Sequence, residues 1–474
     1  KNLNKKSNKK IMKQMKQQNK SSFRDPSGFM FKEKNKLLRQ INLSYQDDYT
    51  QLMKSGLYQQ LVKQNLIIPH TEIDYPQKNS EAYKIIAPQF IPFISYPYEW
   101  CFGQLKTVAL TTLKIQKIAL DFDMSLKDAS AFNIQFYKGQ AVLIDTLSFE
   151  LHKKGQPWVA YKQFCQHFLA PLSLMVYKDL KLNQLSRLFI DGIPLDLASR
   201  LLPKKTKLKF SLLTHIHLHA HSQKHFANKQ IDKSKKQFSK KTLLALIDNL
   251  ESTVKNLSLP KLQTEWEKYY TFTNYSDTAF INKQKKIQKW LNKTKAQSVW
   301  DLGANTGLFS RLASQQNINT VSFDIDLLAV EKNYQDQIKN KEKNILPLFC
   351  DLTNPSPNLG WAHEERDSLQ KRGPADVIMA LALIHHLAIS NNLPFYNIAE
   401  YFAKLGNWLI IEFVPKNDSK VQKLLSTRQD IFTKYTEDDF EKSFSIFFDI
   451  QEKISINKSV RILYLMKNKN SHEK

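Results

Sequence analysis

Cysteine is scarce in this sequence: the 474 residues contain three, Cys101, Cys165 and Cys350, and they lie far apart. Their spacing contains no pair of the kind that zinc sites use, so we expect no metal site, and an odd, isolated set suits a reducing compartment. No apolar run reaches about 18 residues, so the sequence predicts no membrane span. The basic start lacks the apolar segment of a secretory signal. We therefore expect a cytoplasmic protein, and Lys1 in place of Met leaves the completeness of its N-terminus open.

Acidic residues are in deficit, with 44 Asp and Glu against 70 Lys and Arg, which gives a net charge of +26. The excess is concentrated in a tail over residues 1–22, which has no acid, and in the stretch from Lys224 to Lys241. Both patterns are typical of flexible basic segments rather than of a folded binding face. Their expected partner is RNA or another acidic surface, although a general bias toward lysine and asparagine explains much of the charge.

The most informative stretch is 299–310, with the sequence Val-Trp-Asp-Leu-Gly-Ala-Asn-Thr-Gly-Leu-Phe-Ser. An apolar strand end leads into Asp301, two glycines follow four residues apart, and a helical pattern begins. Gly303 lets the chain turn sharply off the strand, and Gly307 keeps the helix start open to a ligand. Asn305 stands where a dinucleotide-binding loop has its second glycine, and its side chain would crowd a pyrophosphate. The loop therefore favours a nucleoside cofactor without phosphate.

The next predicted strand ends on Asp324, where a carboxylate can accept hydrogen bonds from both hydroxyls of a ribose. Together, the loop and this acid resemble the class I S-adenosylmethionine-dependent methyltransferases. The resemblance covers about 200 residues, a typical domain. It implies a doubly wound, Rossmann-like α/β domain with a seven-stranded sheet and S-adenosyl-L-methionine as cofactor. Strands after the loop are expected at 320–326, 346–352, from 375 onward, 406–415, 445–456 and 459–466.

The resemblance implies a set of cofactor-binding positions in this domain: Asp301, Gly303, Asn305, Gly307, Asp324, Asp351 and Ala380. Asp351 matches the acid that often meets the adenine amino group in this family. Two of these acids also have a structural alternative, because Asp301 can brace the loop and Asp351 can be an ordinary turn residue. Asp326 is expected to cap the following helix rather than to touch the cofactor.

Three residues are candidates for catalysis or acceptor contact: His385, His386 and Glu412. Histidine is a suitable general base because its free pKa lies near neutrality. One of two adjacent residues often faces the core. The structural alternative is therefore that His385 or His386 is a buried core residue and not a catalytic group. The methyl acceptor, an oxygen or nitrogen nucleophile, is not identified by the sequence.

An aromatic-rich lead-in, 264–280, comes before the loop and is followed by a helical run over 281–291. Methyltransferases often carry such a segment, which closes over cofactor or acceptor, so Tyr270, Tyr275 and Lys283 are site candidates. The alternative is that the aromatic residues pack the lead-in onto the sheet.

The first half predicts a mixed α+β domain, with a hairpin over 23–42, a helix at 49–64 and a long helix at 103–122. After it, Asp128 and Asn133 lie five residues apart, and a short hairpin ends on Asp145. This spacing resembles the catalytic and metal-binding loops of protein kinases and small-molecule kinases, which implies phosphate transfer. Leu126 and Lys127 replace the usual His-Arg, and Leu147 replaces a glycine. The alternative is a structural or acceptor-recognition domain in which Asp128 caps a turn.

Four histidines alternate along one stretch: His215, His217, His219 and His221. On a strand they would share a face and could bind metal, but the stretch after Pro203 has a helical pattern, in which residues two apart diverge. The expected organisation is a basic tail at 1–22, an α+β, possibly kinase-like domain at 23–225, a basic linker with a bridging helix at 226–262, and the methyltransferase domain at 263–474. We expect the first domain to shape acceptor recognition; an RNA-modifying methyltransferase and a bifunctional kinase–methyltransferase are the alternatives.

Overall fold

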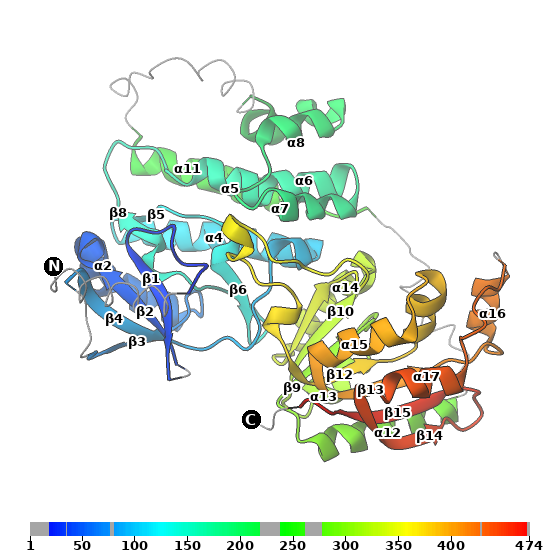
Figure 1. Cartoon of the computed structure of the whole chain (residues 1–474). Coiled ribbons are helices and arrows are strands. Elements are labelled where there is room, and N and C mark those ends of the chain that lie inside the picture. Colours follow the sequence, from blue (N-terminus) through cyan, green and yellow to red (C-terminus); the bar gives the residue numbers. More distant parts are fainter. Residues whose placement is uncertain are drawn as a thin grey trace, which may run out of the picture. The chain divides into compact units, whose positions relative to one another are not determined.

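The structure is a computed structural model, and it describes residues 19–34, 36–75, 80–218, 238–260, 277–426 and 429–471. The chain divides into two compact units (Figure 1). The first unit consists of residues 1–98, 104–260 and 358–366, and the second of residues 99–103, 261–357 and 367–474. Two short segments, 99–103 and 358–366, therefore belong to a different unit from their neighbours in sequence. No local sequence pattern predicts this division.

The second unit is built on a seven-stranded sheet with the order β11-β10-β9-β12-β13-β15-β14. Its strands are β9 (Ser298–Leu302), β10 (Asn319–Asp324), β11 (Ile345–Phe349), β12 (Ala375–Ala380), β13 (Gly406–Phe413), β14 (Phe448–Ser455) and β15 (Ile462–Asn468). Pairing is parallel from β11 to β13, and β15 runs antiparallel to both of its neighbours. The Rossmann-like α/β domain implied by the family resemblance is confirmed.

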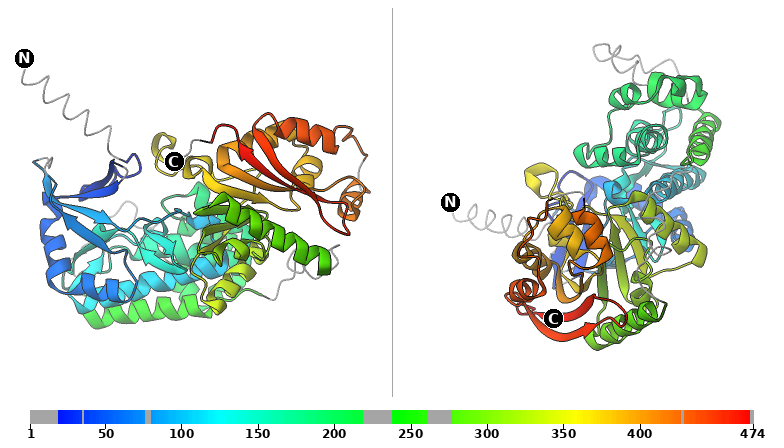
Figure 2. Two further views of the ribbon diagram at one scale, coloured as in Figure 1. Left: turned by 90° about the horizontal axis from the view of Figure 1, so that it is seen from below. Right: turned by 90° about the vertical axis from the view of Figure 1, so that its right-hand side faces the viewer.

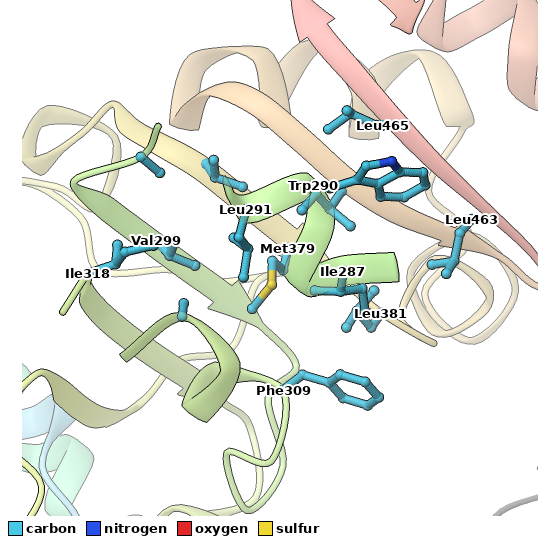
Figure 3. Close-up of a cluster of buried hydrophobic side chains, with 14 of the residues drawn as sticks. Ile287, Trp290, Leu291, Val299, Phe309, Ile318, Met379, Leu381, Leu463 and Leu465 are labelled. Atoms are coloured by element: carbon cyan, nitrogen blue, oxygen red, sulfur yellow. The ribbon is translucent and has the colours of Figure 1, made fainter. Parts of the chain in front are cut away.

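The helices of this unit are α12 (Asp277–Thr294), α13 (Ser310–Ser314), α14 (Leu327–Asn340), α15 (Phe395–Leu405), α16 (Ser419–Leu425) and α17 (Glu437–Phe444). Parallel strands covered on both faces are nearly all apolar, as in Val377 to Ala380 of β12. The core on one face joins α12 to the sheet. Figure 3 shows Trp290 and Leu291 of α12 among Met379 of β12 and Leu463 and Leu465 of β15.

The strand order changes direction at β9, because β10 lies on one side of it and β12 on the other. In open α/β sheets such a switch point leaves a crevice outside the carboxyl ends of the strands, and ligands bind there. The loop after β9, which belongs to the most informative stretch of the sequence, therefore lies at the switch point of the sheet.

The first unit contains a four-stranded antiparallel sheet with the order β1-β2-β4-β3. Its strands are β1 (Gly28–Glu33), β2 (Lys36–Asn42), β3 (His70–Ile73) and β4 (Ala82–Pro88). Two further antiparallel pairs follow: β5 (Met124–Leu126) pairs with β8 (Phe149–Leu151), and between them β6 (Ile134–Tyr137) and β7 (Gln140–Leu143) form a hairpin. The expected hairpin over 23–42 is confirmed as β1–β2. The helical stretch expected at 49–64 is confirmed, but as two helices: Gly56 adopts a φ of 90° and separates α2 (Gln46–Lys54) from α3 (Leu57–Lys63).

The remaining helices of the first half are α4 (Phe102–Asp121), α5 (Tyr161–Phe164), α6 (Ala170–Tyr177), α7 (Leu185–Leu188), α8 (Leu195–Leu201), α9 (Phe210–Leu212) and α11 (Lys240–Asn256). A π-helical segment, Leu213–Leu218, continues α9, so the histidine-rich stretch is helical as far as the structure describes it. No helix in the described parts of the chain is long and apolar enough to cross a bilayer.

Candidate cofactor site at the carboxyl end of the sheet

A cavity of about 430 Å³ opens in the second unit at the carboxyl ends of its parallel strands. This volume is within the range of about 300–1,000 Å³ that is usual for small-molecule sites. The lining residues are Phe280, Lys283, Asp301, Gly303, Ala304, Asn305, Phe309, Asp324, Ile325, Cys350, Asp351, Leu352, Thr353, Leu381, Ala382, Leu383, His386, Leu387, Ser390, Asn391 and Leu424. Most of the wall is apolar, and a few charged and polar groups converge on it, as a site for an uncharged ring system with polar edges requires.

The loop after β9 forms one wall of the cavity. Gly303, Asn305 and Gly307 all adopt left-handed backbone, with φ values of 75°, 51° and 78°, which glycine and asparagine tolerate better than other residues. A Cβ on Gly303 would lie 3.1 Å from Leu383, so glycine also keeps this wall thin. Gly307, which the sequence also predicts to lie open to the ligand, is not among the residues that line the cavity. The side chain of Asn333 fills the space where its Cβ would be.

Asp324 is the last residue of β10, and its carboxylate is hydrogen-bonded to the loop that follows β9. Its carboxylate accepts hydrogen bonds from the backbone N–H of Asn305 at 2.6 Å and from that of Asp326 at 2.8 Å. Burial raises the pKa of Asp324 to about 6. The carboxylate lines the cavity and its oxygens keep lone pairs for a ligand's hydroxyl groups. Asp326 caps α14 through the N–H groups of Leu328 and Ala329, as expected from the sequence.

Asp301 is 2% exposed and faces both the cavity and the loop. Its Oδ2 accepts a hydrogen bond of 2.6 Å from the Ser310 hydroxyl, which in turn lies 2.9 Å from the Ser322 hydroxyl. Burial raises the pKa of Asp301 to about 7, and the nearby charge of Asp324 adds to the shift. Asp301 thus braces the start of α13 against β10, and it adds a second acid to the cavity wall.

The other two expected cofactor positions differ from each other. Asp351 lines the cavity, and its Oδ1 accepts bonds from the N–H and hydroxyl of Thr353 at 2.8 and 2.6 Å, so it is also a turn acid. Ala380 is fully buried and is not among the residues that line the cavity. Alternate residues of a strand face opposite sides of the sheet, and the positions just after it, Leu381 and Ala382, supply the wall instead.

The two adjacent histidines have different surroundings. His386 lines the cavity, whereas His385 is 1% exposed, does not line it, and has an Nδ1 without a hydrogen-bond partner. Burial lowers the pKa of His386 to about 4, helped by the positive charge of Arg461. Its imidazole is therefore neutral at pH 7 and can accept a proton.

Lys283, on the wall of the cavity, is the first of a connected set of buried charged side chains. Lys283, 2% exposed, lies with its Nζ 2.6 Å from Oε2 of Glu412, and Arg461 places a guanidinium nitrogen 3.6 Å from the other carboxylate oxygen. Arg461 also donates to both oxygens of Asp418, at 2.7 and 3.1 Å. Glu412 itself does not line the cavity, so its expected direct contact with the acceptor is replaced by contact with Lys283, which does. The sequence pointed to Lys283 and Glu412 but gave no signal for Arg461 or Asp418.

Several residues named by the sequence fall outside the described residues: Tyr270, Tyr275, His219, His221, Lys224 and the lysines before residue 19. Of the histidine-rich stretch, His215 contacts Tyr161 and Asn249, each at 2.7 Å, and His217 contacts Ser199 and Thr206 at 2.8 and 2.9 Å. The two rings face different neighbours, as a helix requires. Within the described residues, no three His, Cys, Asp or Glu side chains are grouped so as to hold a metal ion.

The kinase-like candidates lie in the first unit around Ser148. The Ser148 hydroxyl donates to Asp145 at 2.9 Å and accepts from the amide of Asn133 at 3.3 Å, so these two residues are brought together. Asp145 also pairs with Arg39 at 2.5 Å.

Asp128, the third kinase-like candidate, is bound to different neighbours. Its carboxylate accepts from the N–H of Ser130 at 2.9 Å and from the amide of Gln163 at 2.7 Å. Every one of the three candidates therefore has protein partners of its own, and Asp128 caps a turn as the structural alternative expects.

A comparison with curated proteins finds the nodulation protein NoeA of Rhizobium meliloti (strain 1021), which is 31% identical over 452 residues, covering 94% of each chain. No family model matches the chain. Similar solved structures include the PH0226 protein from Pyrococcus horikoshii OT3, with 14% identity over 44% of this chain and 100% of that one and a TM-score of 0.31. They also include magnesium protoporphyrin IX methyltransferase (ChlM) from Synechocystis PCC 6803 with bound SAH, with 18% identity, coverage of 43% and 93%, and a TM-score of 0.30. WbdD aligns at 15% identity over 41% of each chain, with a TM-score of 0.28, so the match spans less than half of WbdD.

Proposed function

The chain belongs to the family of the nodulation protein NoeA, and we propose that its second unit is an S-adenosylmethionine-dependent methyltransferase that acts on an oxygen or nitrogen of its acceptor. The observation that carries this proposal is the position of Asp324. Its buried carboxylate closes β10 at the switch point of the sheet and is tied to the Gly303–Asn305 backbone that forms the cavity wall. Neighbouring hydroxyls of a ribose are donors that fit such a carboxylate.

The residues present fit this cofactor. Asp324 would hold the ribose, the thin wall at Gly303 admits the ligand close to backbone, and Asp301 places a negative charge near a cationic ligand. Lys283 lines the cavity and offers N–H donors to the carboxylate of the amino-acid part of the cofactor, although burial lowers the pKa of its amine well below the usual value. The bound cofactor supplies a methyl group that its sulfonium already activates, so alignment of the acceptor and exclusion of water provide most of the rate.

His386 is the residue we assign to proton removal, because it is the neutral base on the cavity wall. Replacing it with glutamine is expected to lower the methyl-transfer rate about 10²–10⁴-fold, the usual contribution of a general base, and to change cofactor affinity less than twofold. The measurement is incorporation of labelled methyl from S-adenosylmethionine in a cell extract that keeps its small molecules, together with calorimetry of cofactor binding.

His385→Gln is the matched control for this experiment, since His385 adjoins His386 but lies off the cavity. It should retain transfer within a few fold at equal folded protein. Equal losses in the two variants would argue that His386 acts through packing and not as a base.

Cofactor affinity should depend on pH through Asp324. Its pKa is raised to about 6 in the free protein, and ribose hydroxyls bond better to the ionised form, so affinity is full above pH 7 and falls as the pH drops through 6. We expect the Kd of S-adenosylhomocysteine to rise by up to about tenfold per pH unit below 6. Titration calorimetry from pH 7.5 to 5 measures this. Asp324→Asn should bind weakly and lose the steep fall below pH 6, keeping only the dependence that Asp301, with a pKa of about 7, contributes. A flat profile in the unmodified chain would sink the assignment.

Two alternatives concern the rest of the chain. An RNA acceptor would be served by the basic segments, which lie mostly outside the described residues. A phosphotransferase in the first unit is supported by the order of α4, Asp128, Asn133, the β6–β7 hairpin and Asp145, but Arg39 already pairs with Asp145. We favour acceptor recognition for this unit.

The direct test of the proposed function is native mass spectrometry of the purified chain. We expect it to carry an adenosyl nucleoside, or to take one up when S-adenosylmethionine is added. Uptake of a nicotinamide dinucleotide in its place would contradict the proposal.

A further inference from the structure

A second hollow, of about 400 Å³, lies in the same unit between α12 and the turn that joins β14 to β15. Figure 2 shows α12, in green, beside the red β14–β15 hairpin. The hollow, which we call the lysine groove, is lined by Asn282, Lys283, Lys285, Lys286, Lys289, Ile454, Ser455, Ile456, Asn457 and Leu463. None of these ten residues is acidic. The methyl-transfer mechanism uses only Lys283 among them.

Three of the four lysines of the groove come from one face of α12, whereas Lys283 lies on the buried face. Lys285, Lys286 and Lys289 follow Asn282 at spacings of three, four and seven residues, which brings side chains to the same side of a helix. The opposite face carries the buried Ile287, Trp290 and Leu291 of the core. The helix therefore presents one apolar face to the sheet and one cationic face to the groove.

Among the described residues, Lys285, Lys286 and Lys289 of the groove make no ion pair with an acid. Glu452 is the acid that approaches this side of α12: it pairs with Lys293 at 2.6 Å and accepts from the indole of Trp290 at 2.9 Å. Its pKa is lowered chiefly by these two bonds, with a smaller effect of Lys286. Lys283 is already paired with Glu412, so the unbalanced charge is that of Lys285, Lys286 and Lys289. Like charges four residues apart, such as Lys285 and Lys289, destabilise a helix. A bound anion would offset this repulsion.

The floor and far wall of the groove decide what kind of anion fits. Ile454, Ile456 and Leu463 give an apolar floor, and Ser455 and Asn457 add neutral hydrogen-bonding groups. Ammonium groups are compact charges with three donors each, which suits phosphate oxygens. A hollow of this size fits a small molecule, whereas an RNA backbone needs a long cationic track.

The groove also adjoins the cofactor cavity. Lys283 lines both hollows, with its buried end at Glu412 and Phe309. A ligand held in the groove is therefore separated from the methyl-transfer site by little more than one side chain of α12. This adjacency is what an acceptor-binding subsite requires.

We propose that the lysine groove binds the phosphate or diphosphate group of a small-molecule methyl acceptor. The description of that ligand as an acceptor rests on the proposed function, whereas binding of the anion itself does not. The ligand class is a phosphorylated or nucleoside-diphosphate-linked small molecule with an apolar or sugar-like portion that lies on the floor of the groove.

The test is calorimetric titration of the full chain with inorganic pyrophosphate, and in a second arm with a nucleoside diphosphate, at low ionic strength. The groove variant is Lys285→Gln/Lys286→Gln/Lys289→Gln. The matched control is Lys339→Gln/Lys341→Gln/Lys343→Gln, which removes the same charge from exposed positions of the same unit. We expect saturable binding that weakens at least tenfold in the groove variant and less than twofold in the control.

The two arms of the titration distinguish a free anion from an ester-linked ligand. They also distinguish anion binding by the groove from its role in binding the acceptor. Tighter binding of the nucleoside diphosphate than of pyrophosphate supports an ester-linked ligand, and equal binding assigns the groove to the free anion, which overturns the acceptor role. Equal weakening in both triple variants, or binding only of a short RNA, overturns the groove itself. S-adenosylhomocysteine binding is measured on the same samples. If the unmodified chain does not bind this compound, the proposed function alone is contradicted. If the groove variant binds it as the unmodified chain does, the variant is folded.

Discussion

Replacing Asp324 with alanine is expected to weaken binding of S-adenosylhomocysteine by about 1.5–3 kcal/mol, the usual worth of hydrogen bonds to a charged group. This is a rise in Kd of about 10–150-fold. Two losses contribute: the ligand's hydroxyls lose their acceptor, and the N–H of Asn305 loses the carboxylate that holds the loop at 2.6 Å. Isothermal titration calorimetry at pH 7.5 measures the change.

The control for this variant is Asp326→Asn. Asp326 lies two residues further along, and its carboxylate caps α14. Asparagine is also a good capping residue, so this variant should fold and bind the ligand within about twofold. If both variants bind as well as the unmodified chain, the ribose assignment fails, and if both lose binding, the effect belongs to the loop rather than to the carboxylate.

Replacing Arg461 with leucine is expected to lower the free energy of unfolding of the chain's second unit by about 3–5 kcal/mol. Arg461 is 1% exposed and lies between two buried carboxylates, Glu412 and Asp418. Removing one partner of a buried ionic group leaves the others uncompensated, and that is what makes the loss large. Chemical denaturation followed by tryptophan fluorescence measures the change.

Lys404→Leu gives the matched control, since Lys404 pairs with Glu400 on the exposed side of α15. An exposed pair of this spacing contributes about 0.3–0.5 kcal/mol, so the control should be nearly as stable as the unmodified chain. The double change Arg461→Leu/Asp418→Asn should regain part of the loss, because the carboxylate that Arg461 contacts most closely loses its charge together with Arg461. A loss below 1 kcal/mol for Arg461→Leu would show that water reaches these carboxylates.

The cofactor loop could be predicted from the sequence because its requirements are local. A strand end, a sharp turn at Gly303 and an acid at the end of the next strand all follow from short-range patterns, and the structure places Asp301, Asn305 and Asp324 on one cavity wall. Gly307 also adopts a left-handed conformation. A Cβ at this position would meet the side chain of Asn333 in α14, so the glycine is required by helix packing and not by the ligand. That contact depends on how α14 packs, which spacing alone does not encode.

The groups behind the cavity could not be predicted for the same reason. Arg461 and Asp418 are 43 residues apart in sequence and meet only because β15 inserts beside β13. The split of the expected 49–64 helix at Gly56 is another case, since a glycine inside a helical pattern is often tolerated. The assignment of residues 358–366 to the first unit depends on tertiary contacts that no periodicity reveals.

The most direct test of the central claim, that the cavity at the ends of β9 and β10 binds S-adenosylmethionine, is calorimetry of the folded full chain with this cofactor and with S-adenosylhomocysteine. The account predicts saturable binding of one molecule per chain that is weakened at least tenfold by Asp324→Ala. Absence of heat and of competition with either compound, on protein whose cooperative unfolding shows that it is folded, would contradict it.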